Sequence, residues 1–97
     1  MSAFIEMIKM CKTDKELKKL IVDTLTESEI EMVEERFHIL YELDQGLSQR
    51  AVKEKLNVSI ATVTRGAKVL KKGKSIIPKL VKETDYFENN LFKRRKS

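Results

Sequence analysis

Apolar residues recur along this chain at helical spacing, and no long stretch alternates with the period of two that marks a strand. The two residue types that most often interrupt helices are scarce, because the chain has three Gly and one Pro. The pattern therefore predicts an all-α protein, and 97 residues are enough for a single domain, 1–97.

The N-terminal third predicts a helix over Ser2–Cys11 that continues to Ile21, with or without a break near Thr13. The sequence from Thr26 to Glu29 has the form of a capping box, in which the threonine oxygen and the glutamate each bond a backbone N–H. This signal predicts the start of a long helix that runs through residue 43.

The long helix is apolar around much of its circumference. One predicted buried stripe, at 3, 4, 3 spacing, is Ile30, Val33, Phe37 and Leu40. A second apolar sector is Met32, Ile39 and Leu43. A helix with two apolar sectors usually meets more than one neighbour, and in so short a chain this favours a second subunit. Gly46 then ends the helix where a left-handed residue is least costly.

Two short helices follow, joined by a three-residue turn. Ser48 is a candidate N-cap for a helix over Gln49–Leu56, and Asn57 tolerates the left-handed conformation of a tight turn. Ser59 is a candidate N-cap for the next helix, residues 60–72. This arrangement predicts a helix-turn-helix at about 48–70. Its predicted core is Val52, Leu56, Val58, Val63 and Leu70.

A last helix is predicted after Ser75, with Pro78 in its first turn, where a missing N–H costs little. Its predicted apolar side is Ile77, Leu80, Val81 and Tyr86. Residues 93–97 form a basic tail, and the whole chain is expected to have about six helices.

Charge divides the chain sharply. Residues 1–44 hold six Lys or Arg and eleven Asp or Glu, whereas residues 45–82 hold ten and one. From Ser59 to Lys82 there is no acidic residue at all. Such a surface suits a phosphate polymer, because each contact releases condensed counterions. Two other interpretations are a solvated lysine-rich face, and a helical adaptor that binds an acidic protein or an anionic membrane through residues 65–82.

The chemistry of the remaining residues argues against an enzyme. His38 is the only histidine and Cys11 the only thiol, so we expect no metal site, no catalytic set and no disulfide within the chain. No stretch approaches the roughly 20 apolar residues of a membrane span. Glu6 interrupts the apolar start that a signal peptide needs, and we therefore expect a cytoplasmic protein without a membrane partner.

Several motifs of the helix-turn-helix resemble one family, the bacterial tryptophan repressors. They are Leu-Ser-Gln-Arg at 47–50, Lys53, Ser-Ile-Ala-Thr-Val-Thr-Arg-Gly at 59–66, and Leu-Lys at 70–71. The likeness extends over about four-fifths of the chain. It implies an intertwined, all-helical homodimer that represses transcription at a double-stranded DNA operator, with L-tryptophan as corepressor and no cofactor.

The resemblance also implies a tryptophan site. Arg36 and Arg65 would stack on the two sides of the indole, and Arg65 would pair with the carboxylate, with Thr26 assisting. Gly66 would leave room for the ring. The carbonyls expected near the amino group belong to Asp23 and Leu25.

Other roles for the same residues remain open. Thr26 has a sufficient task as an N-cap, Arg36 has glutamates nearby for a surface salt bridge, and Arg65 could contact phosphate alone.

On the DNA side, the residues that the resemblance places near phosphates or outer bases are Gln49, Arg50 and Lys53. Those that would face the groove are Ile60, Ala61, Thr62 and Thr64. These side chains are small or short and polar, which suits a helix end pressed against base edges. Lys71 would contact the DNA backbone, together with Lys68 from the same basic surface.

The chain also departs from the family near the proposed ligand. Val69 stands where the family usually has a serine that helps to close the pocket, and residues 67–68 are Ala-Lys in place of Ser-Asn. The loop after Gly46 is one residue shorter than in common members. These differences motivate an alternative: the same DNA-binding fold with another effector or with none.

Overall fold

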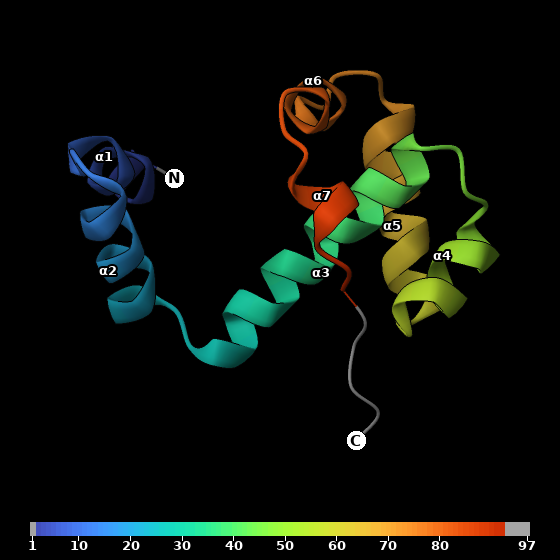
Figure 1. Cartoon of the computed structure of the whole chain (residues 1–97), viewed down its shortest axis with the longest axis horizontal. Coiled ribbons are helices and arrows are strands. Elements are labelled where there is room, and N and C mark those ends of the chain that lie inside the picture. Colours follow the sequence, from blue (N-terminus) through green and yellow to red (C-terminus); the bar gives the residue numbers. More distant parts are fainter. Residues whose placement is uncertain (1, 93–97) are drawn as a thin grey trace. The chain divides into compact units, whose positions relative to one another are not determined.

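The structure, a computed structural model, describes residues 2–92, and these residues form helices and no strand (Figure 1). The helices are α1 (Ser2–Met10), α2 (Asp14–Thr24), α3 (Glu27–Asp44), α4 (Gln49–Leu56), α5 (Ile60–Lys71), α6 (Ile77–Lys82) and α7 (Tyr86–Asn89). The all-α prediction is confirmed, with seven helices in this part of the chain where about six were expected. The predicted basic tail, 93–97, lies outside the described residues. None of the helices described is long and apolar enough to cross a bilayer.

The chain divides into two compact units, Met1–Glu31 and Met32–Ser97. The first unit contains α1 and α2, which are separate helices because a break occurs at residues 11–13. Thr13 causes the new start, since its side chain accepts a hydrogen bond from the backbone N–H of Glu16 at 3.1 Å. Neither helix has a buried residue, and apolar side chains such as Phe4, Met7 and Val22 are 40–66% exposed.

The capping box at the start of α3 is confirmed. Thr26 Oγ1 accepts the N–H of Glu29 at 3.1 Å, and the N–H of Thr26 donates to Glu29 Oε1 at 2.9 Å. The hydrogen bond from the Thr26 backbone stabilises the carboxylate, so it lowers the pKa of Glu29 from its usual value. Two orphan donors at the helix start are thereby satisfied.

The helix-turn-helix forms at the predicted residues. Ser48 Oγ accepts the N–H of Ala51 at 3.1 Å, and Ser59 Oγ accepts the N–H of Thr62 at 3.2 Å, so both serines are N-caps. Asn57 ends α4 in the left-handed conformation, with φ of 57°. These local bonds fix where α4 stops and α5 begins.

The apolar core of the second unit lies where α4 and α5 meet the C-terminal half of α3, as Figure 1 shows. Its buried members are Ile39, Val52, Leu56, Val58 and Val63, with Leu43, Leu47 and Phe92 packed against them. Four of the five predicted core residues are therefore confirmed. Leu70, the fifth, is only half-buried.

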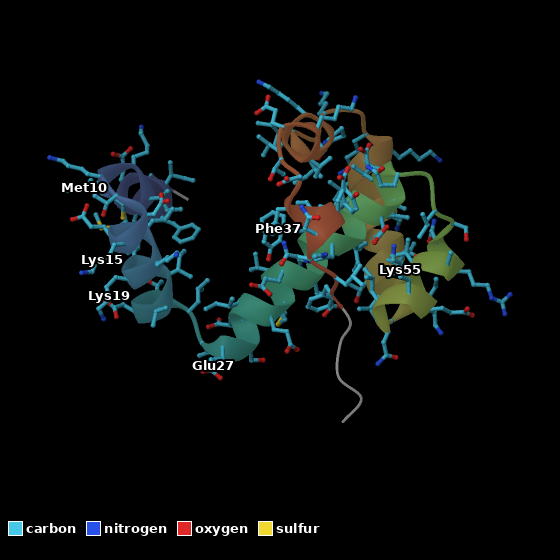
Figure 2. All side chains as sticks on the ribbon, in the orientation of Figure 1. Met10, Lys15, Lys19, Glu27, Phe37 and Lys55 are labelled. Atoms are coloured by element: carbon cyan, nitrogen blue, oxygen red, sulfur yellow. The ribbon has the colours of Figure 1, made fainter. Side chains whose placement is uncertain are left out.

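The predicted stripe of α3 is wrong in part. Val33 is 38% exposed and Phe37, labelled in Figure 2, is 44% exposed, while Ile30 and Leu40 are half-buried. The periodicity identified apolar positions correctly, but it could not show which of them this unit covers.

The buried face of α3 holds polar residues as well as Ile39. They are Glu35, His38 and Glu42. The Glu42 carboxylate, on a side chain 7% exposed, accepts from Lys55 Nζ of α4 at 2.8 Å. Charge-assisted bonds of this kind satisfy a buried carboxylate, so the pair ties α4 to α3.

The C-terminal segment differs from the prediction in its helix boundaries. Ser75 is not the N-cap of α6, although its hydroxyl accepts the N–H of Ile77 at 3.1 Å, and Pro78 does lie in the first turn. Tyr86 belongs to α7 and not to the apolar side of α6.

His38 is surrounded by aromatic rings at the C-terminal segment. Its ring lies 5.0 Å from that of Phe87 and 5.3 Å from that of Phe92, centre to centre, and the residue is buried. Burial lowers the pKa of His38 from its usual value, although the negative charges of Glu34 and Glu42 oppose the shift.

One contact sets the distance between α3 and α5. Gly66 of α5 faces α3, and a Cβ atom at this position would lie 2.9 Å from Ile39 Cγ2, closer than such atoms approach in proteins. Ile39 is 1% exposed and branched at Cβ, so it has little freedom to move. The absence of a side chain at position 66 therefore permits the close packing of the two helices.

The buried, uncharged state of His38 predicts that acid destabilises the protein. The unfolded chain takes up this proton near pH 6.5, whereas the folded protein does so only at lower pH. The free energy of unfolding should therefore fall as the pH drops below about 6.5. Urea unfolding at about pH 7.5 and about pH 5.5 measures this loss. His38→Phe should lose less stability between the two values, and an equal loss in both proteins would contradict the assignment.

Gly66→Ala should destabilise the fold despite its better helix propensity. Alanine gains about 1 kcal/mol over glycine inside a helix, but overpacking a rigid core costs about 1–3 kcal/mol. We expect a net loss of about 1 kcal/mol in urea unfolding. Ile39→Leu removes the methyl group with which the new Cβ collides. In the Ile39→Leu protein, Gly66→Ala should therefore raise the free energy of unfolding instead of lowering it. Unchanged or higher stability of Gly66→Ala would show that the helices separate freely.

Candidate DNA-binding surface and ligand cavity

The predicted DNA-contacting residues lie on α4 and α5, and most are open to solvent. The exposed members of the set are Gln49, Arg50, Lys53, Ile60, Ala61, Lys68 and Lys71. Ile60 is 44% exposed at the start of α5, where an apolar side chain can contact the methyl group of a thymine. The start of the second helix thus offers both apolar contact and polar groups.

The basic segment, residues 59–82, holds its charges without internal neutralisation. None of its seven Lys or Arg side chains forms an ion pair with a described residue. All seven are exposed: Arg65, Lys68, Lys71, Lys72, Lys74, Lys79 and Lys82. Elsewhere in the described chain, lysines such as Lys19 and Lys55 do pair with carboxylates. The segment is therefore a surface on which an external polyanion would relieve charge repulsion.

Two threonines predicted to face the groove, Thr62 and Thr64, are only half-exposed, and their hydroxyls bond within the protein. Thr64 Oγ1 donates to Gln49 Oε1 at 2.8 Å, which links α5 to the start of α4. The hydroxyls of Thr62 and Ser59 are 2.8 Å apart. Neither hydroxyl is therefore a free, rotating group at the surface.

A cavity of about 200 Å³ lies between α3 and α5. Its lining residues are Arg36, Ile39, Leu40, Thr62, Arg65, Gly66 and Val69. The lining follows helical spacing, since residues three or four apart share a face. The structure thus brings together four of the residues expected to bind a ligand, Arg36, Arg65, Gly66 and Val69.

The cavity has the size and chemistry for a small aromatic anion. A cavity of about 150 Å³ holds benzene, so about 200 Å³ is suited to a somewhat larger ring system. Ile39, Leu40 and Val69 supply apolar wall. Arg36 and Arg65 are exposed at its edge, and neither has an ion pair among the described residues. Guanidinium groups stack on aromatic rings and pair with carboxylates.

The other three expected ligand residues, Asp23, Leu25 and Thr26, belong to the first unit and are not among the lining residues of this cavity. Asp23 accepts a hydrogen bond from Lys19 Nζ at 2.6 Å, and Thr26 caps α3. The local role of Thr26 is thus present whether or not it also meets a ligand.

Sequence reasoning missed part of the cavity wall. Ile39 and Leu40 follow Arg36 by three and four residues on α3, and Thr62 precedes Arg65 by three on α5. This spacing would have placed each residue on the same helix face as the neighbouring arginine. Thr62 had been expected at the groove, whereas it lines the cavity.

The described residues contain no group of three or more His, Cys, Asp or Glu side chains that could hold a metal ion.

Comparison with known proteins points to one family. Residues 1–85 match the family described as Trp repressor protein. Trp operon repressor homologs from Xylella fastidiosa and Chlamydia trachomatis are 45% and 40% identical to the chain, covering 67% and 71% of it and 75% and 74% of their own lengths. The homolog from Haemophilus influenzae is 32% identical over 72% of the chain and 70% of its own length. No solved structure matches the chain significantly.

The exposed helix-turn-helix, the basic segment and these similarities agree. The chain belongs to the Trp repressor protein family, whose members are DNA-binding regulators and not enzymes.

Proposed function

We propose that this chain is a homodimeric transcriptional repressor that binds an operator when L-tryptophan occupies the cavity between α3 and α5. The observation that carries the proposal is the position of this cavity, whose walls come from both the central helix α3 and the recognition helix α5. A ligand there contacts the element that would enter the DNA groove. Because such a repressor acts on the chromosome, we place it in the cytoplasm.

The binding of duplex DNA is supported by the helix-turn-helix and by the basic segment. The exposed start of α5 would enter the major groove, and the lysines of residues 68–82 would contact phosphates. In a dimer the two recognition helices would lie one turn of DNA apart, which fits a palindromic operator.

L-tryptophan as the corepressor is supported by the two arginines at the edge of an apolar cavity. Arg36 and Arg65 would hold the indole between them, and Arg65 would also pair with the carboxylate. Val69 lies in the lining, where an apolar side chain can contact the ring. In the dimer, Asp23, Leu25 and Thr26 would complete the site around the amino group and the carboxylate.

The ligand would act by shifting a population. Bound tryptophan would stabilise the orientations of α5 in which both cavity walls contact the ligand. It favours the DNA-binding state only to the extent that its affinity for that state exceeds its affinity for the other orientations. Gly66 keeps α5 close enough to α3 for one small molecule to touch both.

A homodimer is supported by apolar surface that neither unit buries by itself. In the first unit no residue of α1 or α2 is buried. In the second unit Phe37 lines an apolar cavity of about 180 Å³ with Leu80 and Phe87. Contiguous exposed apolar side chains mark interaction surfaces, and intertwining with a second copy would cover these.

Titration calorimetry should detect one L-tryptophan per chain, bound more tightly than L-phenylalanine, which has the smaller ring. Arg65→Met should abolish binding, since it removes the stacking and carboxylate-pairing group. Lys68→Met is a matched control, because it removes the same charge from α5 at a position outside the cavity lining. Equal DNA affinity with and without tryptophan would favour the same fold with another effector or with none. Failure to retard any duplex at low salt would favour the adaptor function.

Sedimentation equilibrium should show a dimer whose melting temperature rises with protein concentration. Phe4→Glu, which places a charge on the apolar face of α1, should weaken association at least tenfold. Ser2→Glu adds the same charge at an exposed polar position and should leave association unchanged. A wild-type protein that stays monomeric at tens of micromolar would overturn the dimer proposal.

A further inference from the structure

The hydrogen bond between Thr64 and Gln49 joins the two helices of the helix-turn-helix at their DNA-facing side. Thr64 lies in the second turn of α5, and Gln49 is the first residue of α4, 15 positions earlier. The distance from Thr64 Oγ1 to Gln49 Oε1 is 2.8 Å, and the hydroxyl is the donor. The bond therefore gives the exposed Gln49 side chain one preferred orientation before any DNA binds.

The frame that carries this bond is rigid. Val52 of α4 and Val63 of α5 are both 0% exposed, and they lie one helix turn or less from the bonded residues. The cap made by Ser48 fixes the backbone at the start of α4. Because both ends of the bond stand on packed helices, its geometry does not depend on loop motion.

The direction of the bond decides what each group can still do. A glutamine amide has one oxygen that accepts and one NH2 group with two donors, and a threonine hydroxyl has a single proton. Thr64 spends that proton on Gln49 Oε1, so Thr64 can only accept from another partner. The NH2 group of Gln49 lies on the other side of the amide carbon from Oε1, and Gln49 is exposed. The two N–H donors of the Gln49 amide are therefore left for an acceptor outside the protein.

We propose that Thr64 is a positioning residue that holds Gln49 as a hydrogen-bond donor toward an acceptor atom of the operator DNA. This inference rests on the proposed DNA-binding function. The acceptor is either a base edge or a phosphate oxygen. A free glutamine reads adenine with its oxygen and its NH2 group together, whereas guanine presents two acceptors in the major groove. Thr64 engages one of the two lone pairs of Oε1 and fixes the amide plane, so the NH2 group, with two free donors, is the better-placed part of Gln49 for a base contact. Such a contact favours guanine, with its two acceptors, over adenine, which needs the oxygen and the NH2 group together.

The test is selection of binding sites from a random duplex library, followed by affinity measurement at fixed salt. Gln49→Ala should weaken binding to the selected site about tenfold, the typical effect of one lost base contact. Thr64→Val keeps the shape of the side chain and removes the hydroxyl, and it should weaken binding several-fold. Thr64→Ser keeps the hydroxyl and should bind like the wild type. Gln49→Glu keeps the acceptor for Thr64 but has no NH2 group, so it should bind at least as weakly as Gln49→Ala.

The double variant separates positioning from a direct role. If Thr64 acts through Gln49, then Thr64→Val has no further effect once Gln49 is alanine. Independent effects that multiply would overturn the proposal, as would wild-type affinity of Gln49→Ala or Gln49→Glu. Melting temperatures close to that of the wild type exclude loss of folding as the cause.

The two sources of the acceptor give different results. A base contact predicts that Gln49→Ala and Thr64→Val relax the selected sequence at the same base pair, with guanine lost as the preferred base. A phosphate contact predicts that the two variants lose affinity equally for all sequences. Replacing the contacted phosphate by an uncharged methylphosphonate should then weaken the wild-type protein but not the variants. If the wild-type protein selects no sequence and retards no duplex, the proposed function itself fails. If the wild type binds and neither pattern appears, only the role of Gln49 and Thr64 fails.

Discussion

The close contact between α3 and α5 at Gly66 is the constraint on which the rest of the second unit depends. A single added carbon at this position would collide with Ile39, the most deeply buried residue of α3. Ile39 belongs to the core of the helix-turn-helix and also to the wall of the cavity between α3 and α5. The orientation of the recognition helix and the shape of the cavity are therefore properties of one interface. In the proposed function, a small molecule between the two helices would therefore influence a surface that it does not touch.

Local structure in this chain follows closely from the sequence. Ser48, Asn57 and Ser59 mark the ends of α4 and α5 as expected, because caps and tight turns depend on bonds between residues two to four positions apart. The capping box of Thr26 forms for the same reason. The core of the helix-turn-helix could also be predicted from the sequence, since spacing alone places Val52 and Val63 on facing sides of two short helices.

Tertiary features were harder to anticipate. Apolar spacing on α3 could not distinguish Ile39, which the unit buries, from Phe37, which it leaves 44% exposed. The hydrogen bond between Gln49 and Thr64 spans 15 residues and depends on the angle between two helices, which no local pattern encodes. The cavity is an intermediate case. Its arginines were expected from a family resemblance, whereas its apolar wall could have been found by counting three and four residues from Arg36.

The N-terminal unit, whose helices α1 and α2 have no buried residue, also bears on how much repressor a cell accumulates. A segment without a core of its own opens readily, and proteases cleave open segments. In the proposed homodimer a second copy would cover it, so survival of a newly made chain would depend on meeting another chain before a protease does. Encounter rates grow with the square of chain concentration, so abundance would rise more steeply than synthesis. Weak expression would then leave almost no intact protein, and the gene would behave as if it had a threshold.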